Sequence, residues 1–170
     1  MKKAPIMIIL TLFLLVTAGN AFCEEMAKEG TDSGSGFASG TWKLFPLQKG
    51  VGAFVTWEQK GVGLSDSGEG PFHNVSSNCA GINLWVKGLG SSMGYCIEIA
   101  PDGDKLLYQV IEENRKFGAS VQKGKVKYIG GTGKFAGIEG EGEYTSYSVQ
   151  PAEEGTYQSV HKYKMSYKLP

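Results

Sequence analysis

Few side chains in this sequence are candidates for acid–base chemistry. Glu98 is one of them because of its spacing from Cys96. Glu98 follows Cys96 by two residues, so in a strand the two side chains share one face. A glutamate that faces an interior has a raised pKa and serves as a proton donor or acceptor. If Cys96 points inward, Glu98 is an inward acid. If the opposite face, with Tyr95, is the core, Glu98 is a solvated surface residue. Glu98 is the weak catalytic candidate of this sequence.

A second set of reactive side chains lies near the C-terminus, where residues 157–169 alternate in period two. One face is rich in lysine, and the other carries Tyr157, Ser159, His161, Tyr163, Met165, Tyr167 and Leu169. Because lysines must meet water, the tyrosine face is expected to look inward. Inward hydroxyls and an imidazole are typical of a ligand cavity, although tyrosines packed at a rim give the same pattern. The predicted ligand-binding residues are His161, Tyr163, Tyr167 and Trp57.

The sequence contains no recognisable metal or cofactor motif. His73 and His161 lack metal-ligand spacing, although strands distant in sequence could bring both to one carboxylate. No Cys-x-x-Cys pair occurs. The stretch around Gly133 and Lys134 lacks the spacing of a phosphate-binding loop, and no complete Gly-x-Ser-x-Gly is present. We therefore predict no metal and no cofactor.

The elements that would position these side chains are short strands. The chain has 25 glycines among 170 residues and no long helical period, which favours a barrel or sandwich. Arg115, the single arginine, is expected in a loop. We predict an all-β fold, a single antiparallel barrel of about eight strands, with strand segments at 41–48, 52–60, 64–75, 80–86, 93–100, 105–113, 120–129, 140–149 and 157–169.

The N-terminal segment has the pattern of a cleavable export signal. Two lysines precede an apolar run of about 11 residues, shorter than the ~20 needed to span a membrane. Cleavage is expected before Glu24, with a cut before Phe22 as the alternative. Phe22 is too large for a lipidation site at Cys23. The predicted organisation is a helical signal peptide over 1–23, a flexible Gly/Ser-rich linker over 24–40, and a β-barrel domain over 41–170.

Export would limit the partners that the mature chain can meet and would place its cysteines in an oxidising compartment. Without Lys2 and Lys3, 15 basic side chains face 17 acidic ones, so no basic surface for nucleic acid is expected. We predict a periplasmic or secreted protein without a stable membrane anchor after cleavage. An oxidising compartment permits a Cys79–Cys96 disulfide, with two buried free thiols as the alternative.

Residues 128–144, YIGGTGKFAGIEGEGEY, resemble a segment of the allene oxide cyclase barrel superfamily, which includes plant dirigent proteins and exported bacterial relatives of unknown role. The preceding GYCIEIAPDGDKLLYQV, from Gly94, resembles the bacterial branch, and the likeness covers roughly residues 70–149. The resemblance implies an eight-stranded antiparallel barrel with a central cavity, and the frequent trimers of plant members leave an oligomer open. It carries no active-site residue across. The matching residues are Gly130, Gly131, Thr132, Gly133, Phe135, Gly137 and Gly140.

This loop is expected to be a scaffold element rather than a site. Gly130 and Gly131 are suited to positive φ after a strand, and Phe135 is expected to tuck beneath the turn as a plug. The leading functional hypothesis is an exported barrel that binds a small, largely apolar ligand without catalysis. The alternatives are a cofactor-free isomerase or cyclase acting in the same cavity, and a structural or partner-binding domain whose lumen its own side chains fill.

Overall fold

The computed structural model of the chain describes residues 26–116, 118–149 and 153–170, so the predicted signal peptide and Cys23 lie outside it. The described residues form eight strands and one short 3-10 turn, η1 (Gly133–Phe135). The strands are β1 (Glu29–Pro46), β2 (Gly52–Ser65), β3 (Val75–Val86), β4 (Leu89–Ile99), β5 (Lys105–Lys116), β6 (Val121–Gly131), β7 (Glu139–Val149) and β8 (Thr156–Lys168).

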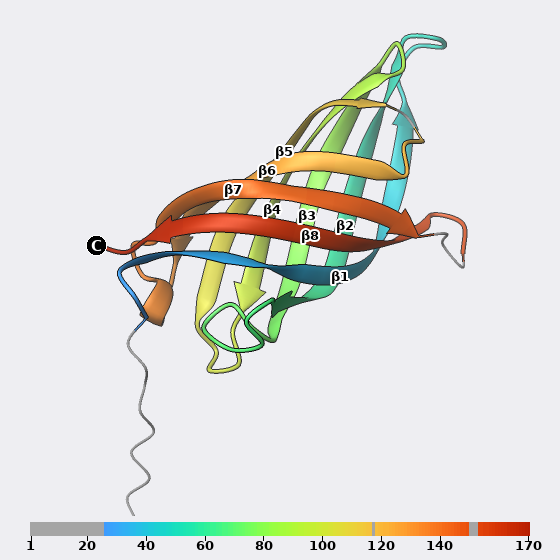
Figure 1. Cartoon of the computed structure of the whole chain (residues 1–170). Coiled ribbons are helices and arrows are strands. Elements are labelled where there is room, and N and C mark those ends of the chain that lie inside the picture. Colours follow the sequence, from blue (N-terminus) through green and yellow to red (C-terminus); the bar gives the residue numbers. More distant parts are fainter. Residues whose placement is uncertain (1–25, 117, 150–152) are drawn as a thin grey trace, which may run out of the picture.

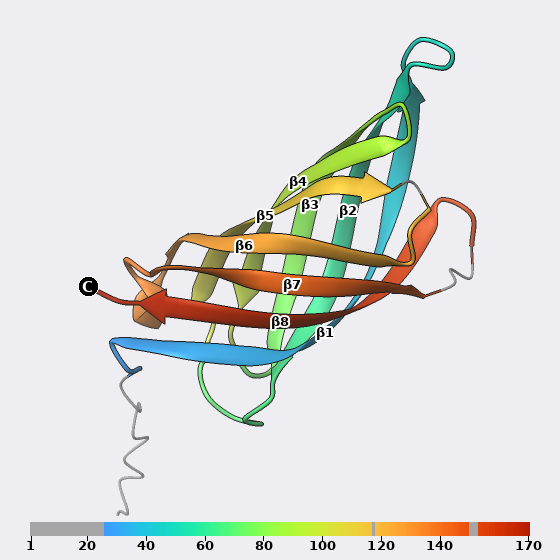
Figure 2. The ribbon, with the colours of Figure 1, turned by 45° about the horizontal axis from the view of Figure 1, so that its top comes forward.

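The strands close into an antiparallel barrel in which every strand pairs with its sequence neighbours (Figure 1). Closure comes from β1 and β8, which pair from Glu29 opposite Lys168 to Thr41 opposite Thr156. Figure 2 shows β1 and β8 side by side, although they are the two ends of the described chain. The predicted all-β barrel of about eight strands is confirmed.

The predicted linker over 24–40 is wrong for residues 29–40, which belong to β1. Its alternating inward positions include Gly34, Gly36 and Ala38, and a Cβ on Gly34 would lie 2.2 Å from the Leu64 carbonyl oxygen. Small residues are therefore required by close contact between strands and not by chain flexibility. The barrel begins at residue 29 rather than at residue 41.

Two further local predictions are corrected. The expected strand 64–75 does not form, because β2 ends at Ser65 and residues 66–74 turn, with Gly68, Gly70 and Asn74 at positive φ. Arg115 lies within β5 rather than in a loop. Both errors come from judging strand ends by composition, which is the least reliable part of such a prediction.

One end of the barrel is closed by an apolar plug. Phe135 of η1 is 1% exposed and packs with Leu106, Phe72 and Tyr128. Gly130 has φ 150°, as expected, but Gly131 does not have positive φ; a Cβ there would lie 2.5 Å from that of Phe135. The Gly-Gly-Thr-Gly segment thus lets Phe135 close the barrel, and the predicted plug is confirmed.

The outer surface carries both apolar and charged side chains. On β3 and β4, Ile82, Met93, Tyr95 and other apolar side chains are exposed. On β6, β7 and β8, lysines and glutamates stand opposite one another in register, as in Lys125, Glu143 and Lys164. Within the described ranges, no helix has the length and hydropathy required to cross a lipid bilayer.

Candidate functional site

The barrel encloses a cavity of about 590 Å³ whose wall draws on all eight strands. Volumes of roughly 300–1,000 Å³ are usual for small-molecule sites. The wall is more apolar than polar and includes all three tryptophans of the chain, Trp42, Trp57 and Trp85. The lumen is therefore not filled by its own side chains.

Inward positions on β3, β4 and β5 form successive rows across the wall, because these strands pair directly. Each row contains one residue from each of the three strands, and successive rows lie at successive levels along the barrel. From the hairpin joining β3 and β4 downward they are Trp85–Gly90–Arg115, Asn83–Ser92–Glu112, Gly81–Gly94–Val110, Cys79–Cys96–Tyr108 and Ser77–Glu98–Leu106.

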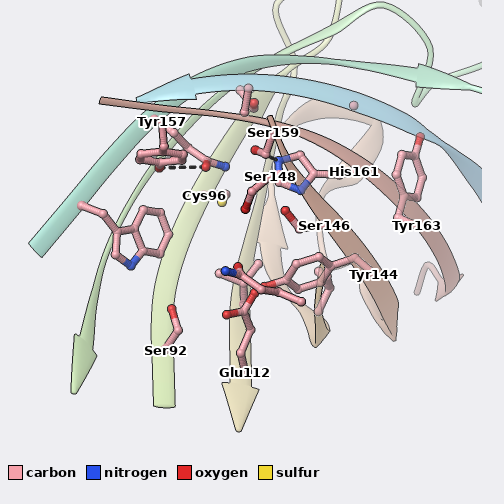
Figure 3. A pocket seen from close by; sticks show the side chains of 18 of the residues that line it. Ser92, Cys96, Glu112, Tyr144, Ser146, Ser148, Tyr157, Ser159, His161 and Tyr163 are labelled. Carbon is pink, nitrogen blue, oxygen red and sulfur yellow. Dashed lines mark hydrogen bonds between the residues drawn. The ribbon is translucent and has the colours of Figure 1, made fainter. Parts of the chain in front are cut away.

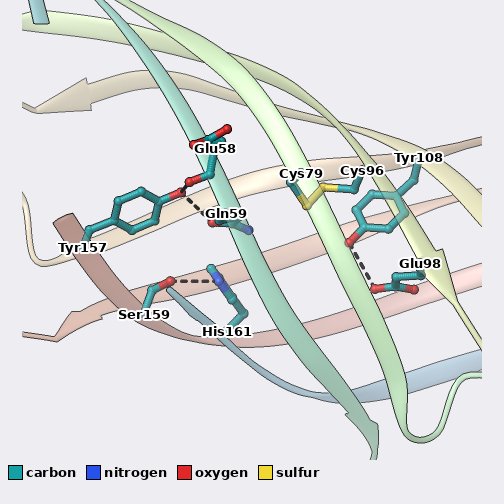
Figure 4. Close-up of a disulfide and its surroundings, with 9 residues drawn as sticks. All are labelled: Glu58, Gln59, Cys79, Cys96, Glu98, Tyr108, Tyr157, Ser159 and His161. Atoms are coloured by element: carbon teal, nitrogen blue, oxygen red, sulfur yellow. Dashed lines mark hydrogen bonds between the residues drawn. A yellow bond between two sulfur atoms is a disulfide. The ribbon is translucent and has the colours of Figure 1, made fainter. Parts of the chain in front are cut away.

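Glu98 stands on the wall near the plugged end. Its Oε1 accepts a hydrogen bond of 3.0 Å from the Tyr108 hydroxyl (Figure 4). Burial raises the pKa of Glu98 to about 7, with a smaller upward contribution from the charge on Asp32, while the Tyr108 hydrogen bond lowers it. Glu98 therefore exchanges its proton near neutral pH and faces the cavity, as expected if Cys96 pointed inward.

Asp32 of β1 is a second acid at this end. Its Oδ1 accepts a hydrogen bond of 2.5 Å from the Ser65 hydroxyl, and its Oδ2 is buried without a hydrogen-bond partner. Burial raises the pKa of Tyr163 most, followed by the charge on Asp32 and by a side-chain hydrogen bond between Tyr163 and Asp32. Tyr128 is likewise held neutral, chiefly by burial and then by the charge on Glu98.

An arginine–glutamate pair occupies the opposite end of the cavity. Arg115 Nη1 lies 2.9 Å from Glu112 Oε2, and the Tyr144 hydroxyl donates a 2.6 Å hydrogen bond to Glu112 Oε1 (Figure 3). The Arg115 guanidinium lies 5.3 Å from the centre of the Trp85 ring and bonds to Asn83 Oδ1 at 3.4 Å. The charge of Arg115 is therefore already compensated within the chain.

The Cys79–Cys96 disulfide separates these two ends, and the prediction that it forms is confirmed. Figure 4 shows Glu98 and Tyr108 on one side of it and two hydrogen-bonded pairs on the other. The Tyr157 hydroxyl donates to Gln59 Oε1 at 2.9 Å, and Ser159 Oγ lies 2.9 Å from His161 Nε2. Burial lowers the pKa of His161, so its imidazole is neutral at pH 7.

Several buried polar atoms of the wall have no hydrogen-bond partner. The donors are Trp57 Nε1 and Arg115 Nε, and the acceptors are Asp32 Oδ2 and Glu112 Oε2, the last held only by its ion pair with Arg115. Buried polar groups are rarely left unpaired in folded proteins. All four atoms belong to residues that line the cavity.

The structure brings together most of the residues chosen from the sequence. Trp57, His161 and Tyr163 line the cavity; Tyr167 does not, because its ring packs 5.2 Å from Phe72 in the plug. The three-ligand site considered around His73 is not formed, since no group of three His, Cys, Asp or Glu side chains among the described residues could hold a metal ion. Ligand contacts by the lining residues stay a prediction.

Among the charged lining residues, Asp32, Glu112 and Arg115 were not chosen from the sequence as site residues. Asp32 was hidden in an apparent linker, although its period-two spacing from Gly34 and Gly36 was a usable signal. Glu112 and Glu113 were indistinguishable by spacing alone, and only Glu112 is buried, at 4% exposed. The position of Arg115 depended on where β5 ended.

Comparison with known proteins adds information at the level of fold. No family model and no curated protein matches the chain. Among solved structures, the pterocarpan synthase dirigent protein GePTS1 aligns over 84% of this chain and 93% of its own length, with a TM-score of 0.50 at 15% identity. The fold is dirigent-like. PsPTS1, another pterocarpan synthase dirigent protein, covers 84% of this chain and 96% of its own at a TM-score of 0.47 and 15% identity.

Proposed function

We propose that this dirigent-like barrel binds a small, largely apolar molecule in its cavity. The observation that carries the proposal is an open cavity of about 590 Å³ with a mainly apolar wall and a few buried, unpartnered polar atoms. Apolar walls supply affinity, and a small number of convergent polar groups supply orientation. An open lumen does not fit the alternative of a barrel filled by its own side chains.

The site is proposed to act outside the cytoplasm, in the periplasm or after secretion. This rests on the export pattern of residues 1–23 and is supported by the Cys79–Cys96 disulfide, since disulfides persist in oxidising compartments. Self-association of the chain stays a prediction.

The three tryptophans of the wall make the proposal directly testable. Ligands that enter the cavity should change intrinsic fluorescence, because the chain has no tryptophan elsewhere. Native mass spectrometry of protein purified from its own host should show a co-purifying molecule, whose identity then guides titrations. The same protein should release that molecule on denaturation.

A matched pair of variants locates the binding. Ser146 is buried and lines the cavity, whereas the neighbouring Thr145 has its side chain on the other face of β7. Ser146→Phe should obstruct part of the lumen and weaken binding, and Thr145→Phe should leave binding intact. Unchanged binding by a folded Ser146→Phe protein would contradict a site in the cavity.

A second candidate, a cofactor-free isomerase or cyclase, is favoured by one observation. Glu98 faces the cavity without an ion-pair partner among the described residues, and its pKa of about 7 suits a general acid or base. GePTS1, which shares the fold, is described as a synthase. Once the bound molecule is known, its conversion should be lost in Glu98→Gln, while Glu113→Gln, on the outer face of β5, should keep full activity. Equal rates in both variants would remove Glu98 from catalysis.

A further inference from the structure

The plugged end of the cavity is acidic and aromatic at once. Asp32 and Glu98 both line it, and each influences the same tyrosines: their charges raise the pKa of Tyr128 beyond the effect of burial. Tyr108 and Tyr163 complete this acidic recess, which we define as Asp32, Glu98, Tyr108, Tyr128 and Tyr163.

No positive charge of the described residues balances the acids of the recess. Neither Asp32 nor Glu98 forms a salt bridge there, and Arg115 is held by Glu112 at the other end of the cavity. His161 is neutral, because burial lowers its pKa. Two carboxylates share a poorly solvated space, and Asp32 Oδ2 has no hydrogen-bond partner.

The tyrosines of the recess add a second source of attraction for a cation. The face of an aromatic ring is electronegative and attracts an ammonium group by roughly 0.5–2 kcal/mol, more when the group is desolvated. The phenols carry no positive charge that could offset the acids, and burial raises the pKa of Tyr108, which keeps its hydroxyl protonated. Carboxylates flanked by tyrosine rings thus match a protonated amine.

We propose that the acidic recess binds a protonated amine, so that the ligand of this cavity is a largely apolar molecule carrying an organic ammonium group. The ammonium group donates to Asp32 Oδ2 and Glu98, and the apolar body runs past the disulfide toward Trp57. This inference rests on the proposed function and specifies the chemistry of its ligand.

Other ligand classes fit the same wall less well. A carboxylate would meet Asp32, Glu98 and Glu112 with only Arg115 in its favour, and Arg115 is already paired. A neutral alcohol could satisfy Asp32 Oδ2 but would offset neither the charge of Asp32 nor, above its pKa of about 7, that of Glu98. A metal ion would need more ligands than the recess offers, since no group of three ligating side chains occurs among the described residues.

The test compares three probes that share one apolar body: 4-phenylbutylamine, 4-phenylbutan-1-ol and 4-phenylbutanoate. Each is titrated into the mature protein at about pH 8, above the pKa of Glu98, with tryptophan fluorescence and calorimetry as readouts. The amine should bind at least about tenfold more tightly than the alcohol, and the carboxylate should bind most weakly.

Isosteric variants test whether the preference for the amine over the alcohol depends on the charges of the acidic recess. The double variant Asp32→Asn, Glu98→Gln keeps the hydrogen-bonding shape but removes both charges, and should bring amine and alcohol to within about threefold of each other. Glu143→Gln is the matched control, because Glu143 is exposed on the outer face of β7, opposite Lys125 and Lys164. It should keep the preference of the unmodified protein.

The outcomes separate the two proposals. If alcohol or carboxylate binds as tightly as the amine, the ammonium inference is overturned while the cavity stands as a ligand site. An amine preference that survives in the double variant also overturns it. If no probe binds and no molecule co-purifies with the protein, the proposed function itself fails, and the inference fails with it.

Discussion

At the scale of single residues, Glu98 has an unusual environment for an acidic side chain. It is an ionisable group on a mainly apolar wall. The charge of Asp32 contributes to raising its pKa, and it accepts a hydrogen bond from Tyr108. A carboxyl group in such a place retains its proton to a higher pH than it does in the unfolded chain. The same property that makes it a candidate proton donor also links it to the stability of the fold.

The first prediction concerns this linkage. The folded chain holds the Glu98 proton up to a pKa of about 7, whereas the unfolded chain loses it near 4.5. The contribution of Glu98 to the free energy of unfolding is therefore fully present below pH 4.5 and falls as the pH rises toward 7. In Glu98→Gln this loss is absent, so the variant should exceed the unmodified protein in stability above pH 7 by on the order of 2–3 kcal/mol.

Urea unfolding of both proteins at several pH values measures the effect. Titration of His161 changes both proteins alike, so the difference between the two curves isolates Glu98. A difference that stays constant from pH 4 to pH 8 would show that the pKa of Glu98 is not raised by folding.

At the scale of elements, close contact between strands and side chains shapes the cavity. Gly81 and Gly94 lie opposite each other on β3 and β4, and the Trp57 ring lies over both. A Cβ on Gly94 would lie 2.4 Å from the ring, so these positions exclude any larger side chain. The glycines hold Trp57 flat against the wall and keep the lumen open.

Gly94→Ala should therefore push Trp57 into the lumen. We expect a loss of about 1–3 kcal/mol in the free energy of unfolding, as is usual for overpacked interiors, with a shift in tryptophan emission. Trp57→Phe in the same chain should recover part of the loss, and Ser91→Ala, on the exposed side of β4, should change neither quantity. An unshifted emission spectrum in Gly94→Ala would contradict this placement of Trp57.

The disulfide joins two directly paired strands and should act mainly on the unfolded chain. Cys79 and Cys96 are 17 residues apart, and closing a loop of that size is worth about 3 kcal/mol on the chain-entropy account. Reduction should lower the free energy of unfolding by this order, measured by urea unfolding with and without reductant. A Cys79→Ala, Cys96→Ala variant should not respond to reductant at all.

The elements also show which parts of the fold could be predicted from sequence. Alternation in β8 correctly assigned His161 and Tyr163 to the interior, because a lysine face fixes which side meets water. Alternation failed in β1, where inward glycines resemble a flexible linker unless the tyrosines that pack on them are known. The pairing of Arg115 with Glu112 depended on a strand end and on a β-bulge near Ser92, and neither has a composition signature.

At the scale of the whole molecule, the barrel depends on a strand that looks dispensable in sequence. β1 contributes the pairing to β8 that closes the sheet, and it also carries Asp32 into the cavity. Without closure, β8 and β2 would each have an unpaired edge, which favours aggregation over a folded monomer.

Truncation tests this dependence. A chain that begins at residue 26 should fold like the mature protein, because it retains the whole of β1. A chain that begins at residue 41 keeps only Thr41 of the β1–β8 pairing and should fail to give a cooperative unfolding transition. Circular dichroism during heating distinguishes the two. Cooperative melting of the shorter chain would show that residues 29–40 are a linker after all.

The pairing of the first strand with the last also determines the order in which parts of the barrel can form during folding. A chain that emerges from its N-terminus presents β1 long before β8 exists, so β1 has only β2 to pair with until the final residues are free. The contacts that seal the barrel are also the most distant in sequence, and such contacts form slowly because of the chain entropy that they restrict. The cavity is therefore the last feature of this protein to be completed, and a chain halted before β8 would have neither a lumen nor a ligand.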